Sequence, residues 1–479
     1  MLPNQQMQNQ NGKVRSNVTP SIWFSKRFFV AIVMFLCYAN TNMVMININI
    51  AIVEMVSDKV IVSGNQTTVQ PAEFQWDPFA VSIISSIYFY GGLFSVFGGY
   101  FVQKMGGSVS GAFAMTISGL LTMLQPAALY LDFRVFLTFR LLNGFFANCF
   151  FLSAAEIYSR WIPRKERSTL ISFSYMGINF SSVISYPLFG YMADRLGWQM
   201  VFYVSGMISI ASSLLCFIIV KNQPSQDKWI STEELRYILD GIDNRSTSKT
   251  ISHPYKKILS SGAVWTLCLA KFSLLWQENI TSGCLPLYIK DMTGKSTDQI
   301  GVLSSIPKIS TIVIYPLAGA LLDYWKNNTG IQLTRMHKIV ITFSFLLASV
   351  LFTLSAFFSN FIITLIIFTA IQIIGSMAPP VIEPNMVNIA PNDSCVVTGL
   401  CKVFASLSML ISRTLTGLMT INHSLQEWNN CFLLTSVVLI IGTAIFNMYG
   451  SSEAQSWSLS SDGQEERDHL INNKNRNQK

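Results

Sequence analysis

The sequence is organised by long apolar runs that alternate with short polar breaks. A helix that crosses a hydrocarbon core of roughly 30 Å needs about 20 consecutive apolar residues. Runs of about that length occur in two sets of six, near residues 28–53, 79–102, 109–129, 135–158, 169–192 and 199–220, and then 263–289, 300–322, 339–357, 360–382, 395–420 and 430–450. Since backbone groups in lipid must be hydrogen-bonded within their own segment, these runs predict twelve membrane-spanning helices.

The composition agrees with a membrane protein and excludes a soluble domain of ordinary size. Charged residues make up 12% of the chain and hydrophobic residues 51%, whereas soluble domains contain roughly 25% charged residues. The formal net charge of +8 comes from Lys and Arg in loops beside the apolar runs, where such residues orient helices in a bilayer. We therefore expect the lipid bilayer, and no nucleic acid, as a partner.

The polar breaks divide the chain into five parts. The longest interior break, 221–262, is rich in charge and separates the two sets of apolar runs. We predict an all-α membrane protein with two six-helix bundles. The predicted parts are a cytoplasmic N-terminal tail 1–27, a first bundle 28–220, a cytoplasmic central loop 221–262, a second bundle 263–450 and a disordered cytoplasmic tail 451–479.

The orientation of the helices follows from the positions of the cations. Basic clusters at 13–27 and 160–167 flank the first and fourth helices, and such clusters remain on the cytoplasmic side. Counting helices from there places both termini inside and the sequons at Asn65 and Asn422 outside. We therefore predict these two asparagines as glycosylation sites, with Asn65 in the longest outer loop.

Two glycine-containing loops occupy corresponding places in the two sets of helices. Gly98-Gly-Tyr-Phe-Val-Gln-Lys-Met-Gly-Gly107 follows the second helix, and Gly319-Ala-Leu-Leu-Asp323 follows the eighth. Both resemble the signature Gly-x-Leu-Ala-Asp loop of major facilitators, in which glycines let helices approach and a charged residue latches the cytoplasmic face. The resemblance implies the major facilitator fold, with substrate held between two related halves.

Further stretches narrow the resemblance to the anion:cation symporter family, which includes sialin, vesicular glutamate transporters and sodium/phosphate cotransporters. They run in order along the chain: Met45-Ile-Asn-Ile-Asn-Ile-Ala-Ile-Val53, Arg140-Leu-Leu-Asn-Gly144, Trp161-Ile-Pro-Arg-Lys-Glu-Arg-Ser168, Gly197-Trp-Gln-Met-Val-Phe-Tyr203, Leu303-Ser-Ser-Ile-Pro307, Asn385-Met-Val-Asn-Ile-Ala-Pro391 and Tyr449-Gly-Ser-Ser-Glu-Ala-Gln-Ser-Trp457. The resemblance implies a divergent secondary transporter of a small organic anion or inorganic phosphate, linked to H⁺ or Na⁺, with no cofactor.

The chain departs from the family at the positions that resemble its functional ones. Met45 replaces an arginine of helix 1, and Asn143 and Ala147 replace two glutamates of helix 4. Lys271 stands where the family has a histidine, and 385–388 reads Asn-Met-Val-Asn instead of Asn-His-Leu-Asp. The acids that exchange protons in the family are therefore missing from their usual positions.

Charged residues inside the predicted spans are the first candidates for a functional site. Each costs about 2.5–3.5 kcal/mol at a helix centre on insertion scales, so we expect it to face a polar cavity or an opposite charge. The set consists of Arg140, Glu156, Lys271, Glu278, Lys308, Lys402 and Arg413. Since a guanidinium can hold a carboxylate with two parallel hydrogen bonds, we expect Arg140 to contact the substrate, as the resemblance implies.

We predict a substrate site made of Arg140, Lys271, Lys308, Lys402, Trp276 and Asn385. Glu278 is the candidate coupling residue, with Lys271 as its expected partner two helical turns away. A structural alternative stands beside each assignment: Arg140 can bond a carbonyl or carboxylate internally, Lys308 and Lys402 can pair structurally, and Glu156 can pair with a loop cation.

Two other classes of protein are alternatives to a transporter. The chain has no phosphate-binding loop of the Gly-x-x-x-x-Gly-Lys-Ser/Thr kind, which argues against a pump. It also has no catalytic constellation, and its four histidines fall in predicted loops or in the tail. We therefore expect no enzyme. A membrane sensor or scaffold derived from a transporter is the alternative function, but the costly charges in helices 7, 8 and 11 favour transport.

The C-terminal tail carries an acidic dileucine pattern, Glu466-Arg-Asp-His-Leu470-Ile471. Sorting adaptors recognise this pattern on the cytoplasmic side of membranes. We therefore expect a lysosomal, endosomal or vesicle membrane in preference to the plasma membrane, with a sorting adaptor as a partner of the tail.

Overall fold

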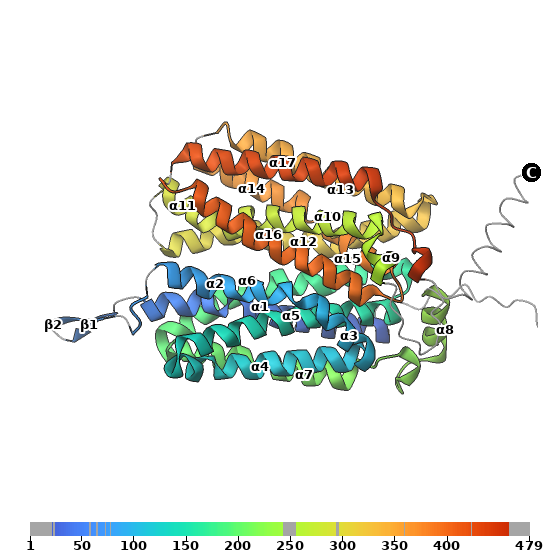
Figure 1. Ribbon diagram of the computed structural model, residues 1–479, viewed down its shortest axis with the longest axis horizontal. Coiled ribbons are helices and arrows are strands. Elements are labelled where there is room, and N and C mark those ends of the chain that lie inside the picture. Colours follow the sequence, from blue (N-terminus) through green and yellow to red (C-terminus); the bar gives the residue numbers. More distant parts are fainter. Residues whose placement is uncertain are drawn as a thin grey trace, which may run out of the picture.

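The computed structural model consists of two layers of roughly parallel helices (Figure 1). The first half of the chain forms one layer and the second half forms the other, and their helices lie along the same direction. The structure describes residues 22, 24–56, 59–63, 66–71, 73–76, 78–242, 255–293, 297–358, 360–422 and 424–458.

The first half contains seven α-helices and a short hairpin outside the helix bundle. The helices are α1 (Lys26–Val56), α2 (Pro78–Leu93), α3 (Ser95–Met105), α4 (Gly107–Leu131), α5 (Phe133–Trp161), α6 (Arg167–Leu196) and α7 (Trp198–Ile219). The hairpin, β1 (Lys59–Ser63) and β2 (Gln66–Gln70), is antiparallel and pairs Lys59 with Gln70. It is an addition to the predicted all-α fold and extends from the end of the bundle opposite α8 (Figure 1).

The second half contains the remaining spans and a π-helical turn. Its elements are α10 (Gly262–Glu278), η3 (Asn279–Gly283), α11 (Leu285–Thr293), α12 (Thr297–Thr329), α13 (Leu333–Ser355), α14 (Phe361–Gly375), α15 (Pro379–Ile389), α16 (Ser394–Met419) and α17 (Leu425–Tyr449). Short helices complete the chain: η1 (Arg164–Glu166), η2 (Pro224–Gln226), α8 (Thr232–Gly241), α9 (Tyr255–Leu259) and η4 (Ser456–Ser458).

Each predicted span coincides with helical structure, although not every span passes a test of length and hydropathy. Within the described residues, nine helices are long and apolar enough to cross a membrane, or ten if the bent pair α2–α3 is one span. The other two predicted spans are the serine-rich α6 and the segment α10–η3–α11, whose first helix has 17 residues. This test therefore supports ten of the twelve predicted spans, with α2 and α3 taken as one span.

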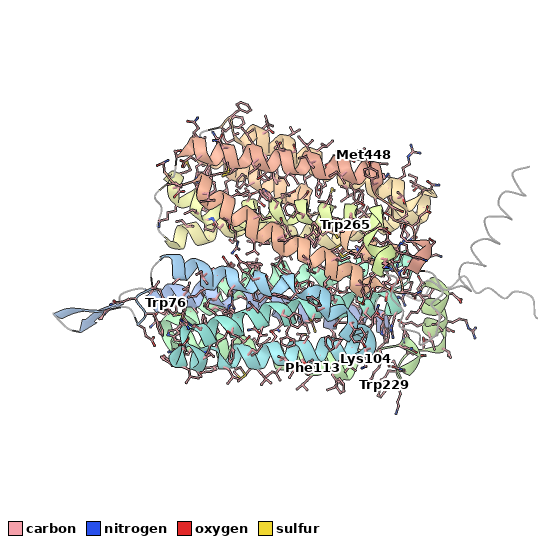
Figure 2. All side chains as sticks on the ribbon, in the orientation of Figure 1. Trp76, Lys104, Phe113, Trp229, Trp265 and Met448 are labelled. Atoms are coloured by element: carbon pink, nitrogen blue, oxygen red, sulfur yellow. The ribbon has the colours of Figure 1, made fainter. Side chains whose placement is uncertain are left out.

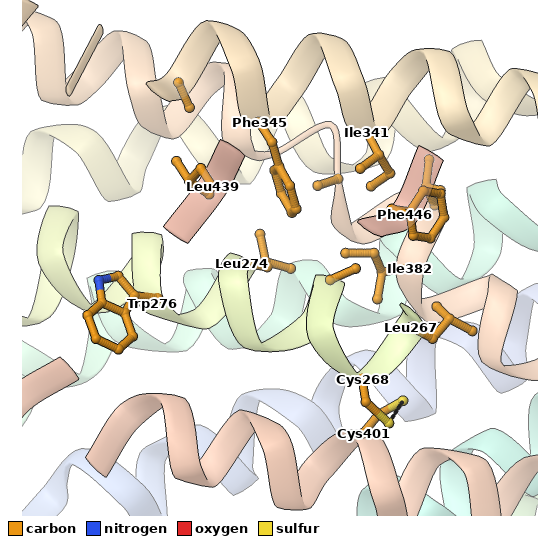
Figure 3. Packing of buried hydrophobic residues seen from close by; sticks show 14 of the residues in the cluster. Leu267, Cys268, Leu274, Trp276, Ile341, Phe345, Ile382, Cys401, Leu439 and Phe446 are labelled. Atoms are coloured by element: carbon orange, nitrogen blue, oxygen red, sulfur yellow. Dashed lines mark hydrogen bonds between the residues drawn. The ribbon is translucent and has the colours of Figure 1, made fainter. Parts of the chain in front are cut away.

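The core of the second half is formed by aliphatic and aromatic side chains from most of its helices. Phe345 of α13, Leu274 of α10 and Leu439 of α17 point toward one another, with Ile382 of α15 beside them (Figure 3). Large apolar residues also lie on the outer faces, where Phe113 and Met448 project away from the two layers (Figure 2). This distribution suits helices with protein on one side and lipid on the other.

The two halves are joined at the end of the molecule that carries α8. Asp323 at the end of α12 accepts hydrogen bonds from the backbone N–H of Ser168 (3.3 Å) and of Thr169 (2.7 Å), and from the Thr169 hydroxyl (2.8 Å). A β-carbon on Gly319 would lie 2.6 Å from the Ser168 carbonyl oxygen. Only glycine therefore permits this approach of α12 to α6.

Further polar contacts cross between the halves at the same end. The Arg167 guanidinium donates to Asn388 Oδ1 at 2.6 Å. Asn327 Nδ2 donates to the carbonyl oxygen of Lys165 at 3.1 Å. We call this end, with the contacts of Asp323, Arg167 and Asn327, the closed end.

The central loop is attached to the first half by buried ion pairs. Arg27, at the start of α1, is fully buried and contacts Glu166 (2.6 Å) and Glu234 of α8 (3.2 Å). Tyr237 of α8 donates to Glu166 at 3.1 Å, and burial raises the pKa of its phenol to about 12. The phenol is therefore a neutral hydrogen-bond donor at physiological pH.

Two sequence expectations need correction. Residues 451–458 do not belong to a disordered tail, because Gln455 donates its N–H to Ile389 at 2.9 Å and the segment packs on α15. His337 is not in a loop, because α13 begins at Leu333, earlier than predicted. Its ring is 1% exposed and lies 2.7 Å from the Ser452 hydroxyl.

Candidate functional site

A buried ion pair inside the second half is formed by Lys271 of α10 and Glu383 of α15. Glu383 occupies this place because the chain breaks after α14 at Gly375 and restarts at Pro379 and Pro380, residues that suit the first turn of a helix. Both side chains of the pair are less than 10% exposed. Removal of one partner from such a buried pair strongly destabilises the fold, because the other charge is left uncompensated.

Glu383 also contacts the first half of the chain. The Tyr175 hydroxyl, on α6, donates to Glu383 Oε2 at 2.6 Å, while Lys271 binds Oε1. The Tyr175 ring packs on Tyr38 of α1, with ring centroids 4.4 Å apart. The carboxylate thus links α10 and α15 of one half to α6 of the other.

A second ion pair lies farther from the closed end and is more open. Lys308 of α12 donates to Glu278 Oε1 at 2.7 Å, and their side chains are 19% and 31% exposed. Glu278 is the last residue of α10 before the π-helical turn, a feature that often accompanies functional sites. The predicted pairing of Glu278 with Lys271 is wrong, since the break between α14 and α15 presents Glu383 to Lys271 instead.

Lys402 is a buried cation that has no acidic partner among the residues that the structure describes. Its ammonium lies 3.1 Å from the ring centroid of Phe151, so a residue of α16 contacts the first half through a cation–π interaction. No carboxylate among the described residues forms an ion pair with it, although Lys271 and Glu383 are close enough to interact electrostatically. The charge of Lys402 is thus balanced by an aromatic ring rather than by a carboxylate in the described part of the chain.

Two arginines flank a pair of aromatic residues on α2. Arg140 lies 5.4 Å from the Tyr88 ring, and Arg413 lies 4.9 Å from the Phe89 ring. Arg140 donates to the carbonyl oxygens of Val44 (3.2 Å) and Met45 (3.3 Å), which is the internal bonding foreseen as its structural alternative. Within the described part of the chain, neither arginine pairs with a carboxylate.

The other predicted substrate residues lie away from these cations. Trp276 is 4% exposed in the core of the second half and donates from Nε1 to Thr435 Oγ1 at 3.3 Å (Figure 3). Asn385 donates to the Ser451 carbonyl oxygen at 3.1 Å, on the segment that follows α17. Glu156, the remaining acid predicted inside a span, pairs with Arg160 at 2.5 Å.

Of the predicted glycosylation and sorting residues, the structure describes Asn422. Asn422 is exposed just before α17 and donates to Glu427 Oε1 at 2.7 Å. Asn65 and the tail motif of Glu466, Leu470 and Ile471 lie outside the described residues.

A small cavity reaches Glu278 from the contact between the halves. It is lined by Asn179 of α6, Thr311 and Tyr315 of α12, and Gln277 beside Glu278, and its volume is about 10 Å³. That volume accommodates about one water molecule. A solute larger than water could therefore enter this cavity only if the halves separate here.

Sequence reasoning missed Glu383 and the bridging role of Tyr175. The predicted span ended at residue 382, so Glu383 was counted as part of a loop. The signal available in the sequence was the pair Pro379-Pro380, which indicates that a helix restarts and continues through the glutamate.

The comparisons with known proteins agree with this architecture. The profile described as Major Facilitator Superfamily matches residues 30–336, more than half of the chain. The chain belongs to the major facilitator superfamily. This membership confirms the predicted fold class.

The most informative relatives are transporters. Vesicular glutamate transporter 1 of Xenopus laevis is 26% identical over 444 residues, which cover 90% of this chain and 76% of the relative. Vesicular glutamate transporter 2 of Homo sapiens is 25% identical and covers 92% of this chain and 77% of the relative. The crystal structure of the E. coli fucose:proton symporter shares the fold, with a TM-score of 0.59, 15% identity and coverage of 87% of this chain and 97% of that one. The predicted resemblance to a secondary transporter is confirmed.

Proposed function

We propose that this major facilitator carries a small organic anion, or inorganic phosphate, across a membrane by alternating access, with H⁺ or Na⁺ as the coupled ion. The two halves separate and reclose around a site between them, as expected for transporters built from related halves. The relatives named for glutamate transport support an anionic substrate.

The observation that carries the proposal is an excess of positive charge on buried and partly buried side chains inside the spans. Lys271 and Lys308 each have a carboxylate partner. Arg140, Lys402 and Arg413 do not have one among the described residues and contact aromatic rings instead. Since an uncompensated charge inside a membrane protein is costly, a bound anion would lower the free energy of this arrangement. We propose that these three cations, with Lys271 and Lys308, attract the substrate.

The proposal is tested by uptake into proteoliposomes that contain the purified full-length chain. Radiolabelled L-glutamate, glucuronate and inorganic phosphate are offered with and without a proton or sodium gradient. Uptake of at least one anion, competed by its unlabelled form and absent from protein-free vesicles, is expected. Failure of all three, in a preparation that is monodisperse and folded, contradicts the proposal and favours the sensor or scaffold.

Residence in a lysosomal, endosomal or vesicle membrane is the second part of the proposal. It is supported by the relatives named as vesicular transporters and by the tail motif Glu466–Ile471. Replacement of Leu470 and Ile471 by alanine should move the chain to the plasma membrane. Surface biotinylation measures this shift, and an unchanged distribution contradicts the sorting role.

Orientation with both termini in the cytoplasm is proposed with it. If both loops face the lumen, Asn65→Gln and Asn422→Gln should each lower the apparent mass of the chain by one glycan. Glycosidase treatment of the wild-type chain should remove the same mass. A wild-type chain that no glycosidase shortens contradicts glycosylation at these positions.

A further inference from the structure

Glu383 lies at the contact between the halves, beside two lysines and a tyrosine. One carboxylate oxygen is held by Lys271 of the same half, and the other accepts from Tyr175 of the opposite half. Lys402, which has no carboxylate partner among the described residues, lies close enough to interact with the same carboxylate.

We propose that Glu383 is the proton-binding residue of this transporter, and that its protonation releases Lys271 to bind the carboxylate of the substrate. The proposal rests on the proposed anion transport and names the coupled ion as H⁺. In the step, a proton bonds to the oxygen of Glu383 that faced Lys271. The ion pair is lost, no covalent bond is broken, and Lys271 joins Lys402 as a second free ammonium.

Charge balance makes the two binding events depend on each other. If Glu383 stays ionised, it neutralises Lys271, and an anion can pair only with Lys402. If Glu383 is protonated without an anion, two buried ammonium groups repel each other without compensation, which is costly. A proton and a monoanion bound together leave the net charge of Lys271, Glu383 and Lys402 unchanged.

Protonation also acts on the contact between the halves. The Tyr175 hydroxyl donates to a charged carboxylate at 2.6 Å, and charge-assisted hydrogen bonds are roughly twice as strong as neutral ones. A protonated Glu383 is a weaker acceptor. Proton binding therefore loosens the attachment of α6 to α15 at the moment when Lys271 becomes available.

The surroundings of Glu383 contain the groups that this mechanism requires. The cations that face it are Lys271 from α10 and Lys402 from α16. The other titratable groups that face it are Cys401 of α16 and the phenols Tyr38, Tyr158, Tyr175 and Tyr315, contributed by α1, α5, α6 and α12. Glu278, the coupling candidate from the sequence, has its partner Lys308 within its own half and no hydrogen bond to the first half among the described residues.

The experiment compares gradient-driven accumulation with exchange in proteoliposomes, with radiolabelled L-glutamate and glucuronate as probes. For one proton per monoanion, an inward gradient of one pH unit supports accumulation of up to about tenfold. Glu383→Gln should retain exchange of labelled for unlabelled anion and lose the accumulation, and Glu383→Asp should restore part of it. Glu278→Gln is measured in parallel.

The possible outcomes separate the two proposals. Accumulation that persists in Glu383→Gln, or that is lost in Glu278→Gln but not in Glu383→Gln, overturns the assignment of Glu383 while anion transport stands. Absence of both exchange and accumulation in the wild type overturns anion transport itself, and this inference with it.

A second measurement covers the case in which Glu383→Gln does not fold. Purified wild-type protein in weakly buffered detergent solution is mixed with L-glutamate or glucuronate, and a pH-sensitive dye reports proton uptake. About one proton taken up per anion bound is expected. Anion binding without proton uptake overturns the inference.

Discussion

The contact between the two halves has two regions with different chemistry. At the closed end, hydrogen bonds of Asp323, Arg167 and Asn327 cross directly between the halves. In the middle, Lys402 and Arg413 of the second half meet aromatic rings of the first half and, among the described residues, no carboxylate. The polar groups of the closed end thus satisfy one another, whereas the cations of the middle region would gain an opposite charge from the proposed anion. In the proposed transport cycle, the hydrogen bonds of the closed end would have to break, and the anion would bind beside the cations of the middle region.

The largest effect is expected at Arg140. Replacement by Gln removes a buried guanidinium, and loss of one partner of the charge pair that it would form with the bound anion costs about 3–5 kcal/mol. Uptake should therefore fall by at least about 100-fold while abundance in the membrane is unchanged. Proteoliposome uptake measures the loss, Arg140→Lys tests the need for charge alone, and the exposed Arg195→Gln is the matched control. Unaltered uptake by Arg140→Gln would remove this residue from the site.

A pair of lysine variants separates attraction of an anion from structural pairing. Lys402→Met removes a buried cation without a carboxylate partner among the described residues and should raise thermal stability by about 1–2 kcal/mol while anion affinity falls about tenfold. Lys308→Met leaves Glu278 uncompensated and should lower the melting temperature. Thermal unfolding in detergent and binding of L-glutamate measure the contrast. Lower stability in both variants would show that the middle region is as complete as the closed end.

A substitution of Asp323 at the closed end is expected to shift the equilibrium between the closed and the open conformation of this end. Asp323→Asn weakens charge-assisted hydrogen bonds to Ser168 and Thr169, each of which contributes about 1.5–3 kcal/mol. The population closed at this end should fall by about tenfold or more, seen as faster hydrogen exchange at the start of α6. Asp227→Asn, which changes a central-loop carboxylate that pairs with Lys26 at the start of α1, is the control. Equal exchange in both variants contradicts a closing role for Asp323.

The smallest effect is expected at the exposed edge of the closed end. Asn327→Ala removes one neutral hydrogen bond to the Lys165 carbonyl, a change of about 0.5–1.5 kcal/mol. Hydrogen exchange at the start of α6 should rise by a few-fold and by less than in Asp323→Asn. A larger effect at Asn327 would mean that the neutral edge, and not the Asp323 carboxylate, holds this end closed.

The sequence predicted the bundle well because lipid imposes one rule on every span. Apolar runs alone located the helices, and the glycine-containing loops located the approach of Gly319 to α6. The pairing of charges was not predictable in the same way. Whether Lys271 meets Glu278 or Glu383 depends on a helix break between α14 and α15, and Arg140 meets the carbonyls of α1 through packing that spacing along its own helix does not encode. Local patterns determine the spans, whereas partners of buried charges depend on contacts distant in the chain.

The fully buried Arg27 has a consequence for how the first half can move. It joins the start of α1 both to Glu166, immediately before α6, and to Glu234 of the central loop. A tilt of α6 relative to α1 would expose or break these ion pairs inside a water-poor environment. The first half, together with α8, should therefore swing as one rigid unit.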